Sequence, residues 1–512
     1  MLRIPLTHEG IPMELKGEQV GWVTSDPRRG LPSTERVPVI LSDGADVGPL
    51  EYLVAEVGED VYALLRVTEL KEYNIHAEPR RLDLEMRVRE TPSSDAGLPG
   101  RYVVAETELV DAFRVRNGGV ELLGPRVLPR SRSPVYKASG AAVGAIMGQA
   151  KLPVEIGELV GTPGVRVGID AEALLRHMIV VGTTGTGKSW FRGLLMERLY
   201  DLGIPQVIID PMADYLQATR ELGGVVLEPG KNYRPRLDAL STSSFLGLVG
   251  DALPTPFQRV VAAKAFELYK DASRKALAPP LPQKLLDCVD KAADLYRARE
   301  DTRENVRARL EEFLNTVGIF GIGFSGSLVG ESWERLMNAR RLVTVDARLD
   351  DLQLQVLMTS ILEELVELRR QGRIPPFILS FDEAHRIVPR GAKGLAGAEL
   401  VKRLIRYGRH MGIGVIAITQ FPDSVDVELI RLPATRVVFA LDTDQLGAIR
   451  GMLMDLPEEL KAMLPKLERG TAVISGTADV VRHTVYVRID SKRRTTHGGV
   501  TPSLTGGRAS RQ

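Results

Sequence analysis

The stretch IVVGTTGTGKSWF, residues 179–191, decides the fold of this 512-residue chain. An apolar strand leads into a glycine-rich turn, and the residues after the turn follow the period of a helix. Gly182 to Ser189 match the pattern G-x-x-x-x-G-K-[ST], whose glycines let backbone N–H groups face phosphates at the positive end of the helix. We therefore predict a nucleotide-binding loop in an α/β fold.

The candidate nucleotide-binding residues of this loop are Gly182, Thr183, Thr184, Gly185, Thr186, Gly187, Lys188 and Ser189. Lys188 should reach the β- and γ-phosphates of ATP, and the hydroxyl of Ser189 should bind Mg²⁺. Arg176 before the strand and Trp190 after the loop complete the candidate set, although Trp190 is most simply a first core contact of the helix. ATP and Mg²⁺ are the expected cofactors.

An acidic pair ends a second apolar strand in PFILSFDEAH, residues 376–385. In enzymes with this loop one acid holds Mg²⁺ and another activates the attacking water, so we assign these roles to Asp382 and Glu383. Switches and kinases of the class often lack the second acid, so Glu383 favours an enzyme that hydrolyses ATP. The alternative is a strand end with two solvated acids, and we expect His385 to be structural.

Two further strand ends carry polar residues. VIIDPMADY places Asp210 and Asp214 after the strand that follows the phosphate-loop helix, and GVIAITQ ends in Gln420, a candidate sensor of the γ-phosphate. The carboxyl ends of parallel strands form the ligand crevice of an open α/β sheet, so both lie at the correct edge. Polar residues are also common at strand ends without any such role.

A basic helix, LVKRLIRYGRHMG at residues 400–412, precedes the strand of Gln420. Arg406 and Arg409 are candidates for an arginine that completes a neighbouring subunit's nucleotide site, and Arg176, at the start of the phosphate-loop strand, is a third and weaker one. The alternative is a solvated helix face.

The loop RIVPRGAKGLAGA follows the acidic pair and carries Arg386, Arg390 and Lys393. These side chains could contact a DNA backbone without regard to its sequence. A flexible surface loop is an equal alternative.

The chain divides into a β-rich part and an α/β part. Residues 1–150 contain short, partly alternating runs that predict a small barrel or sandwich, with SRSPVYKASG at 131–140 as a linker. Residues 151–490 show continuous apolar runs between helices, which predicts a parallel sheet, with TAVISG and VYVRID as a closing antiparallel pair. Amphipathic helices at about 240–321 predict a helical insertion, and 491–512 reads as a basic, flexible tail.

The composition is that of an ordinary globular protein. Net charge is +1, so no global field indicates a nucleic-acid or membrane partner, although 67 Lys and Arg can segregate from 66 Asp and Glu to form a basic surface. The single cysteine, Cys288, cannot form an internal disulfide, and no Cys/His cluster has zinc spacing. There is no signal-like start and no apolar run near the length of a membrane helix, so we predict a cytoplasmic protein.

Five motifs resemble HerA-type ATPases in order and spacing: RHMIVVGTTGTGKS, VIIDPMADY, FILSFDEAHRIVP, RLIRYGRHMGIGVIAITQFP and LERGTAVISGTADVVRHTVYVRI. The resemblance covers nearly the whole chain. It implies a RecA-like core with an inserted helical bundle, behind an N-terminal β-barrel called the HAS barrel. It also implies a homohexameric ring that translocates double-stranded DNA. The usual partner is a nuclease on the barrel, NurA-type in DNA end processing or another effector in phage defence.

The resemblance also assigns a role to each matching candidate. Lys188 and Ser189 would contact the phosphates, Asp382 would hold Mg²⁺ and Glu383 would activate water. Gln420 would sense the phosphate, Asp210 is the acid after the second core strand, and Arg406 or Arg409 is the trans-acting arginine. Two positions depart from the family. Relatives often have Glu where this chain has Asp214, which we give no catalytic role, and Arg where it has Phe421. The alternatives are an ATP-regulated ring scaffold that activates an effector nuclease, and a conjugation-type coupling ATPase.

Overall fold

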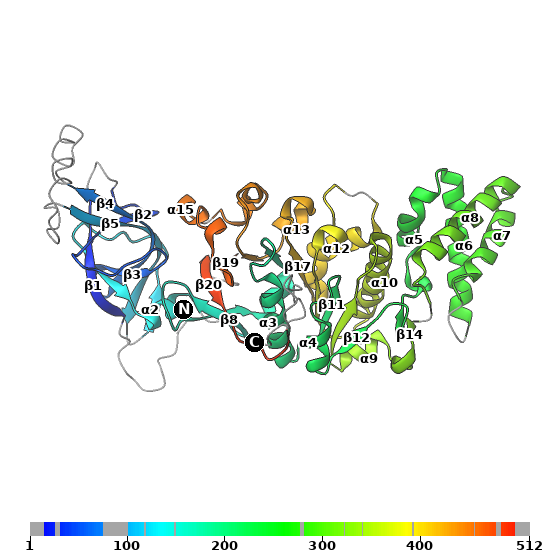
Figure 1. Ribbon diagram of the computed structural model, residues 1–512, viewed down its shortest axis with the longest axis horizontal. Helices are drawn as coiled ribbons and strands as arrows, with labels where there is room; N and C mark the ends of the chain where they lie inside the picture. The colour runs from blue at the N-terminus through cyan, green and yellow to red at the C-terminus, as the bar shows by residue number, and fades with distance from the viewer. Residues whose placement is uncertain are drawn as a thin grey trace, which may run out of the picture. The chain divides into compact units, whose positions relative to one another are not determined.

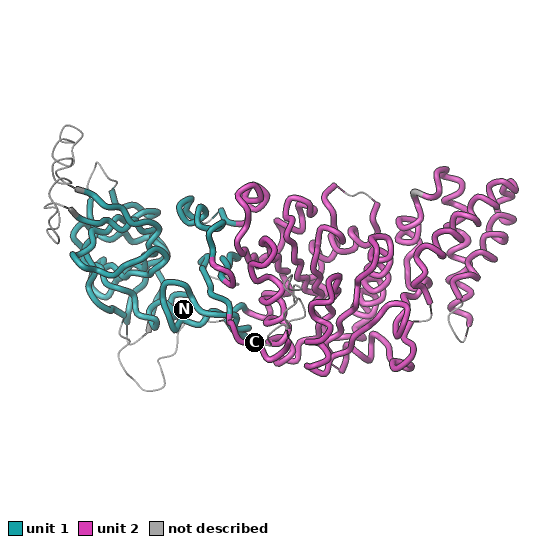
Figure 2. The backbone as a smooth tube through the Cα atoms, in the orientation of Figure 1, with its two compact units in different colours: residues 1–169, 453–467, 471–489 teal, residues 170–452, 468–470, 490–512 magenta. Residues whose placement is uncertain are grey.

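In a computed structural model of the protein, the structure describes residues 15–25, 31–74, 101–116, 119–147, 150–276, 281–321, 323–339, 341–391, 394–454, 456–477 and 483–496. These residues fall into two compact units (Figure 2). Unit 1 comprises residues 1–169, 453–467 and 471–489, and unit 2 comprises residues 170–452, 468–470 and 490–512. Each unit is described by itself below.

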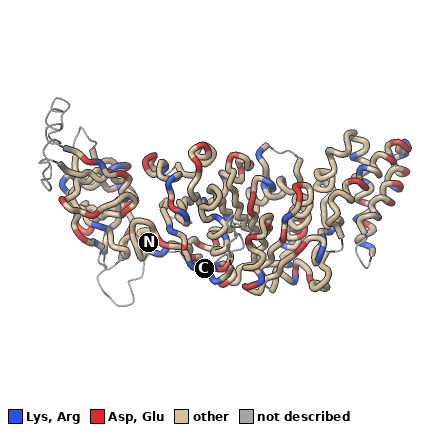
Figure 3. The backbone as a smooth tube through the Cα atoms, viewed as in Figure 1, with Lys and Arg blue, Asp and Glu red and all other residues tan. Residues whose placement is uncertain are grey.

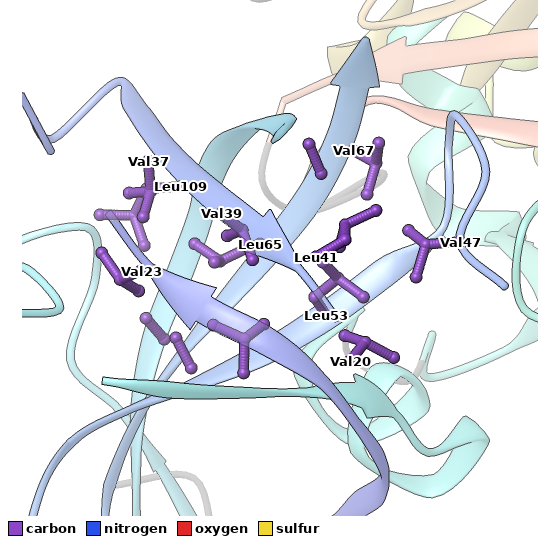
Figure 4. Packing of buried hydrophobic residues seen from close by; sticks show 14 residues of the cluster. Val20, Val23, Val37, Val39, Leu41, Val47, Leu53, Leu65, Val67 and Leu109 are labelled. Carbon is purple, nitrogen blue, oxygen red and sulfur yellow. The ribbon is translucent and has the colours of Figure 1, made fainter. Parts of the chain in front are cut away.

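The N-terminal part of unit 1 is a seven-stranded antiparallel sheet. Its strands are β1 (Lys16–Val23), β2 (Arg36–Leu41), β3 (Tyr52–Gly58), β4 (Val61–Asn74), β5 (Arg101–Arg116), β6 (Gly119–Leu122) and β7 (Pro134–Ala138). They follow the order β2-β1-β7-β3-β4-β5-β6, and β2 also pairs with β5. Alternating side chains point to one side of each strand, so aliphatic residues from six strands, β1 to β5 and β7, meet in a common core, with Val20, Val39, Leu53, Leu65 and Leu109 among them (Figure 4).

The predicted linker at residues 131–140 is wrong. It contains β7, which lies between β1 and β3 and pairs antiparallel with both. Pro134 is tolerated because it is the first residue of the strand, where Pro is allowed. The flanking Ser, Pro and Gly residues hid a short strand in which Val135 is fully buried. The run RRLDLEMRV, predicted as a strand, lies outside the described residues.

Unit 1 also contains β8 (Pro153–Leu159), β9 (Arg166–Asp170), β19 (Thr471–Gly476) and β20 (Val485–Ile489), in the order β19-β20-β8-β9. The pairing of β19 with β20 is antiparallel, as the sequence predicts. The buried Arg66 of β4 donates hydrogen bonds to Glu108 and to the carbonyl oxygen of Thr484. This arginine therefore joins the N-terminal sheet to the segment just before β20.

Unit 2 is built on seven parallel strands in the order β12-β15-β11-β16-β17-β10-β18. Their bounds are β10 Met178–Val181, β11 Gln206–Asp210, β12 Val225–Leu227, β15 Leu342–Asp346, β16 Phe377–Phe381, β17 Ile413–Thr419 and β18 Thr435–Val438. Every residue of β10, β11, β16 and β17 is buried. Continuous burial is expected of strands covered on both faces, so the predicted α/β sheet is present.

Helices connect these strands and extend the unit (Figure 1). The longest beside the sheet are α3 (Lys188–Asp201), α10 (Asp351–Arg370) and α12 (Ala396–Met411). The segment predicted to be a helical insertion contains α5 (Thr242–Val249), α6 (Pro256–Lys275), α7 (Lys284–Leu295) and α8 (Glu300–Val317). Phe245 of α5 stacks on Phe266 of α6 with ring centroids 4.1 Å apart, which fixes the start of this group of helices.

Residues 491–496 lie against α3 and α4 (Leu216–Glu221), which differs from the flexible tail expected of this segment. The buried carboxylate of Glu197 on α3 accepts hydrogen bonds from the backbone N–H groups of Arg494 and Thr495 at 3.0 and 3.1 Å. Burial alone would raise the pKa of Glu197, but the hydrogen bonds from Thr495 and Arg494 lower it below its ordinary value. These contacts give the segment a fixed path.

Basic and acidic residues alternate along the backbone of both units (Figure 3). This matches a chain in which 67 Lys and Arg nearly balance 66 Asp and Glu. In the part of the chain that the structure describes, no helix combines the length and the apolar character required to span a membrane.

Candidate active site

Four neighbouring parallel strands bring the predicted site residues to one edge of the sheet. The phosphate loop follows β10, Gln420 follows β17, Asp382 and Glu383 follow β16, and Asp210 ends β11. These strands are adjacent in the order β11-β16-β17-β10, with Val181 paired to Thr419 and Ile209 to Phe381. The carboxyl edge of the sheet therefore carries a phosphate loop, an amide and three carboxylates in a row.

The phosphate loop has the backbone that its glycines require. Gly187 has φ of 120°, a value that residues other than glycine rarely adopt. A side chain at Gly182 would clash, because its Cβ would lie 2.6 Å from the Cβ of Phe439. Lys188 begins α3, and its Nζ donates to the carbonyl oxygen of Thr183 at 2.7 Å. Burial lowers the pKa of Lys188, opposed by the nearby Asp382 and Glu383. Ser189 is the next residue of the same helix and is half-buried.

Gln420 links the phosphate loop to the candidate base. The hydroxyl of Thr184 donates to Oε1 of Gln420 at 2.5 Å, and Nε2 of Gln420 lies 3.2 and 3.4 Å from the two oxygens of Glu383. Glu383 has φ of 52°, an uncommon value for a residue other than glycine, and such values cluster at functional sites. Nδ1 of His385 lies 3.3 Å from Oε2 of Glu383. The line Thr184–Gln420–Glu383 spans three strand ends.

Asp382 is buried and has one partnered and one unpartnered oxygen. Its Oδ2 accepts a hydrogen bond from the hydroxyl of Tyr215 at 2.6 Å, while Oδ1 has no hydrogen-bond partner among the described residues. Burial raises the pKa of Asp382 to about 7, although the hydrogen bond from Tyr215 opposes that shift. A buried carboxylate oxygen with a free lone pair fits Mg²⁺ or a water bound to it.

The residues present suit Mg²⁺ better than a metal held by protein alone. No group of three or more His, Cys, Asp or Glu residues is placed to hold a metal ion within the described part of the chain. Mg²⁺ is commonly bound through one or two protein oxygens together with substrate phosphates and water. Asp382 and Ser189 are therefore the candidates for its protein ligands.

Asp210 is fully buried, and its carboxylate is occupied by its own turn. It accepts hydrogen bonds from the backbone N–H groups of Met212, Asp214 and Tyr215 at 3.3, 3.1 and 2.8 Å. Burial raises the pKa of Asp210 to about 6, against the opposing hydrogen bond from Tyr215. The carboxylate of Asp210 therefore stabilises the backbone of the turn at residues 210–215.

Two residues of this site escaped the sequence analysis. Tyr215 has a hydroxyl on Asp382, and the guanidinium of Arg192 on α3 is buried and donates to Oγ of Ser380 at 2.5 Å. Burial lowers the pKa of Arg192, opposed by Tyr215 and Asp382. A signal for Arg192 existed, because it follows Lys188 by four residues and therefore shares a helix face with it. Tyr215 ends the motif VIIDPMADY, but nothing in the sequence indicated its bond to Asp382.

Two of the candidate arginines, Arg176 and Arg409, lie toward the opposite edge of the sheet. Arg176 ends the short helix η2 (Ala171–Arg176) ahead of β10, so β10 separates it from the phosphate loop of its own chain. Arg409 lies in the last turn of α12, just before β17 begins, and is exposed. Arg406 is bound by the carboxylate of Glu428 through two hydrogen bonds. None of the three is brought to the carboxyl edge within the chain.

The remaining candidates have local partners. Arg386 donates to Asp351 at 2.7 Å and to the carbonyl oxygen of Leu349, and Arg390 donates to the carbonyl oxygen of Asp423 at 3.3 Å. Lys393 lies outside the described residues. Trp190 donates from Nε1 to the carbonyl oxygen of Asp490 at 2.8 Å, and the guanidinium of Arg493 lies 5.1 Å from its ring centre.

Comparison with known proteins identifies relatives of this chain. Residues 154–365 match the family model described as "Helicase HerA, central domain". The DNA double-strand break repair helicase HerA of Pyrococcus furiosus is 25% identical over 438 residues, which cover 74% of this chain and 77% of that protein.

Two solved structures are similar to the chain. VirB4 of Thermoanaerobacter pseudethanolicus has a TM-score of 0.53 at 19% identity, covering 67% of this chain and 98% of VirB4. The bacterial conjugative coupling protein TrwBdeltaN70 has a TM-score of 0.50 at 15% identity, covering 69% of this chain and 92% of that one. At these identities the likeness shows the fold, which is the α/β phosphate-loop fold that the sequence predicts.

Proposed function

We propose that this chain is an ATP-driven translocase of double-stranded DNA. It resembles HerA-type ATPases in its motifs and in the match of residues 154–365 to the central domain of that family. It would work as a homohexamer with a partner nuclease, in DNA end processing or in defence against phage. The observation that carries the proposal is the line from Thr184 through Gln420 to Glu383. It connects a phosphate loop to a candidate base, as ATP hydrolysis requires.

In this proposal the phosphate loop and Lys188 bind the phosphates of ATP, and Lys188 exchanges its bond to Thr183 for the β- and γ-phosphates. Bound Mg²⁺ supplies positive charge against the phosphate oxygens, and Ser189 and Asp382 would hold it. Glu383 orients the attacking water and accepts its proton. Gln420 is hydrogen-bonded to Thr184 of the loop and to Glu383, so it would couple the presence of the γ-phosphate to the position of the base.

The arginines at the amino edge support a ring. Arg409 is exposed at the end of α12, and Arg176 lies at the start of β10, so neither can serve the site of its own chain directly. In a ring, the amino edge of one subunit could meet the carboxyl edge of the next. We infer that Arg409 is the arginine offered to a neighbour's nucleotide, because Arg406 is already bound to Glu428.

The N-terminal sheet is proposed as the HAS barrel that docks the nuclease. β2 lies at one end of the strand order and pairs with β1, and it also pairs with β5, near the other end. These two pairings support a closed sheet. Arg386 and Arg390 are proposed to contact the DNA backbone without regard to its sequence. To do so, Arg386 would exchange its bonds to Asp351 and Leu349, and Arg390 its bond to Asp423, for DNA phosphates.

The experiment is ATP turnover by the purified protein, measured with and without duplex DNA at several salt concentrations. We expect hexamers by light scattering and stimulation by duplex DNA that falls steeply with salt. Glu383→Gln should bind ATP but lose turnover by about 100-fold or more, whereas Lys188→Ala should lose nucleotide affinity. Glu312→Gln, on exposed α8, is the matched control. A monomer whose turnover ignores DNA would refute the proposal.

Two other functions remain in the test. A conjugation-type coupling ATPase is supported by the fold that the chain shares with TrwBdeltaN70 and VirB4. An ATP-regulated scaffold would activate its nuclease upon ATP binding alone. Isolating the protein with its natural partner identifies which kind of complex it forms. Nuclease activation by the Glu383→Gln protein would then favour the scaffold over the translocase.

A further inference from the structure

Tyr215 connects the two buried acids of the site. It is 1% exposed and precedes α4, at the end of the turn that follows β11. Its backbone N–H donates to Oδ2 of Asp210 at 2.8 Å, and its hydroxyl donates to Oδ2 of Asp382 at 2.6 Å. One residue thus contacts the carboxylates at the ends of two adjacent strands.

The turn that carries Tyr215 is fixed from within. The carboxylate of Asp210 accepts three backbone N–H groups of residues 212–215, so the backbone of Tyr215 has little freedom to move. The ring is also packed near the guanidinium of Arg192, which lies 5.9 Å from its centre. The position of the hydroxyl is therefore determined by the turn and by α3 together.

The hydrogen bond divides the two oxygens of Asp382. Oδ2 is held by Tyr215, whereas Oδ1 is buried without a hydrogen-bond partner among the described residues. Arg192 places a buried positive charge in the same region through its bond to Ser380, two residues before Asp382 on the same strand face. A carboxylate fixed through one oxygen presents the other in a single orientation.

We propose that Tyr215 is a positioning residue of the Mg²⁺ site, which acts by holding Asp382 so that Oδ1 is available to the metal or its water shell. Asp210 contributes indirectly, because its hydrogen bonds fix the turn that carries Tyr215. This inference rests on the proposed nucleotide site and gives a role to Tyr215, the last residue of the motif VIIDPMADY, to which the sequence analysis assigned none. In this proposal Tyr215 acts through its hydrogen bond to Asp382.

The test is the affinity for a fluorescent ATP analogue, measured with Mg²⁺ and with EDTA. In Tyr215→Phe, affinity in EDTA should stay within about twofold of the wild type. The tightening caused by Mg²⁺ should fall about tenfold, since a hydrogen bond to a charged group is worth roughly that factor. Tyr233→Phe is the matched control, because Tyr233 is equally buried and its hydroxyl accepts from Trp333 at 3.3 Å.

A second variant shows whether Tyr215 acts through Asp382. Asp382→Asn should lose the tightening by Mg²⁺, and Tyr215→Phe added to it should cause no further loss. A Tyr215→Phe protein with full tightening, or a double variant that loses more than Asp382→Asn alone, would overturn the inference. Failure of the wild type to bind the analogue at all would instead refute the proposed nucleotide site, and this inference with it.

Discussion

His177, which is 3% exposed just before β10, should contribute a destabilisation of unit 2 on acidification, opposite in sign to the contributions of the buried Asp210 and Asp382, whose pKa values are raised. Its Nδ1 accepts a hydrogen bond from the backbone N–H of Val415 at 3.1 Å, and the ring is also hydrogen-bonded to the backbone of Ile405. A ring that accepts through one nitrogen and donates through the other is neutral. Burial lowers the pKa of His177 from 6.5 to about 4, with the Ile405 hydrogen bond opposing the shift.

The direction follows from proton binding. Between pH 6.5 and 4 the unfolded chain holds a proton on His177 that the folded chain does not, so stability is full above pH 6.5 and falls as the pH drops. The pKa difference, 6.5 − 4 = 2.5, corresponds to about 3 kcal/mol at 1.36 kcal/mol per pKa unit. About 2 kcal/mol of this should already be lost at pH 5.

The assay is urea unfolding followed by tryptophan fluorescence from pH 7.5 to 5. Trp190 and Trp333 report on unit 2. His177→Gln retains an acceptor and a donor but cannot titrate. The contributions of Asp210 and Asp382 are common to both proteins, so between pH 7.5 and 5 the stability of the wild type should decrease by about 2 kcal/mol relative to that of the variant. His410→Gln, on the exposed face of α12, should behave as the wild type. Equal pH dependence of the wild type and His177→Gln would refute the reasoning.

Three further predictions concern the site and its surroundings. Gln420→Ala should reduce ATP turnover by about tenfold or more while analogue binding is retained, because it removes the link from the loop to the base. Arg409→Ala should reduce turnover more than Arg406→Ala, whose side chain is already held by Glu428; steady-state hydrolysis compares them. Glu197→Gln should loosen residues 491–496 and cost about 1–3 kcal/mol of stability, seen as faster backbone hydrogen exchange in that segment and a lower urea midpoint.

The sequence was sufficient for the parallel sheet but not for every strand. β11, β16 and β17 are short, mostly apolar runs followed or ended by polar residues, a pattern typical of strands buried on both faces. β7 has five residues between Ser, Pro and Gly, and its burial depends on β1 and β3, which are distant in the sequence. Local pattern alone could not supply those partners.

The same limit applies to the candidate site. The motifs predicted which residues share the carboxyl edge, because strand order places strand ends together. They did not predict that Tyr215 would bond to Asp382, 167 residues away, since a tyrosine after a turn ordinarily packs in a core. Nor could they predict that Thr495 would bind Glu197, 298 residues away, because both residue types are usually solvated.

The contacts of residues 491–496 have a practical consequence for anyone who shortens or tags the protein. The last strand, β20, ends at Ile489, and a designer guided by secondary structure would cut there. Such a truncation removes the backbone donors of Thr495 and Arg494, so the buried carboxylate of Glu197 on the phosphate-loop helix loses these two hydrogen bonds. A truncation or tag that spares residues up to Thr496 keeps the hydrogen bonds of this segment to Glu197 of α3 and Glu221 of α4.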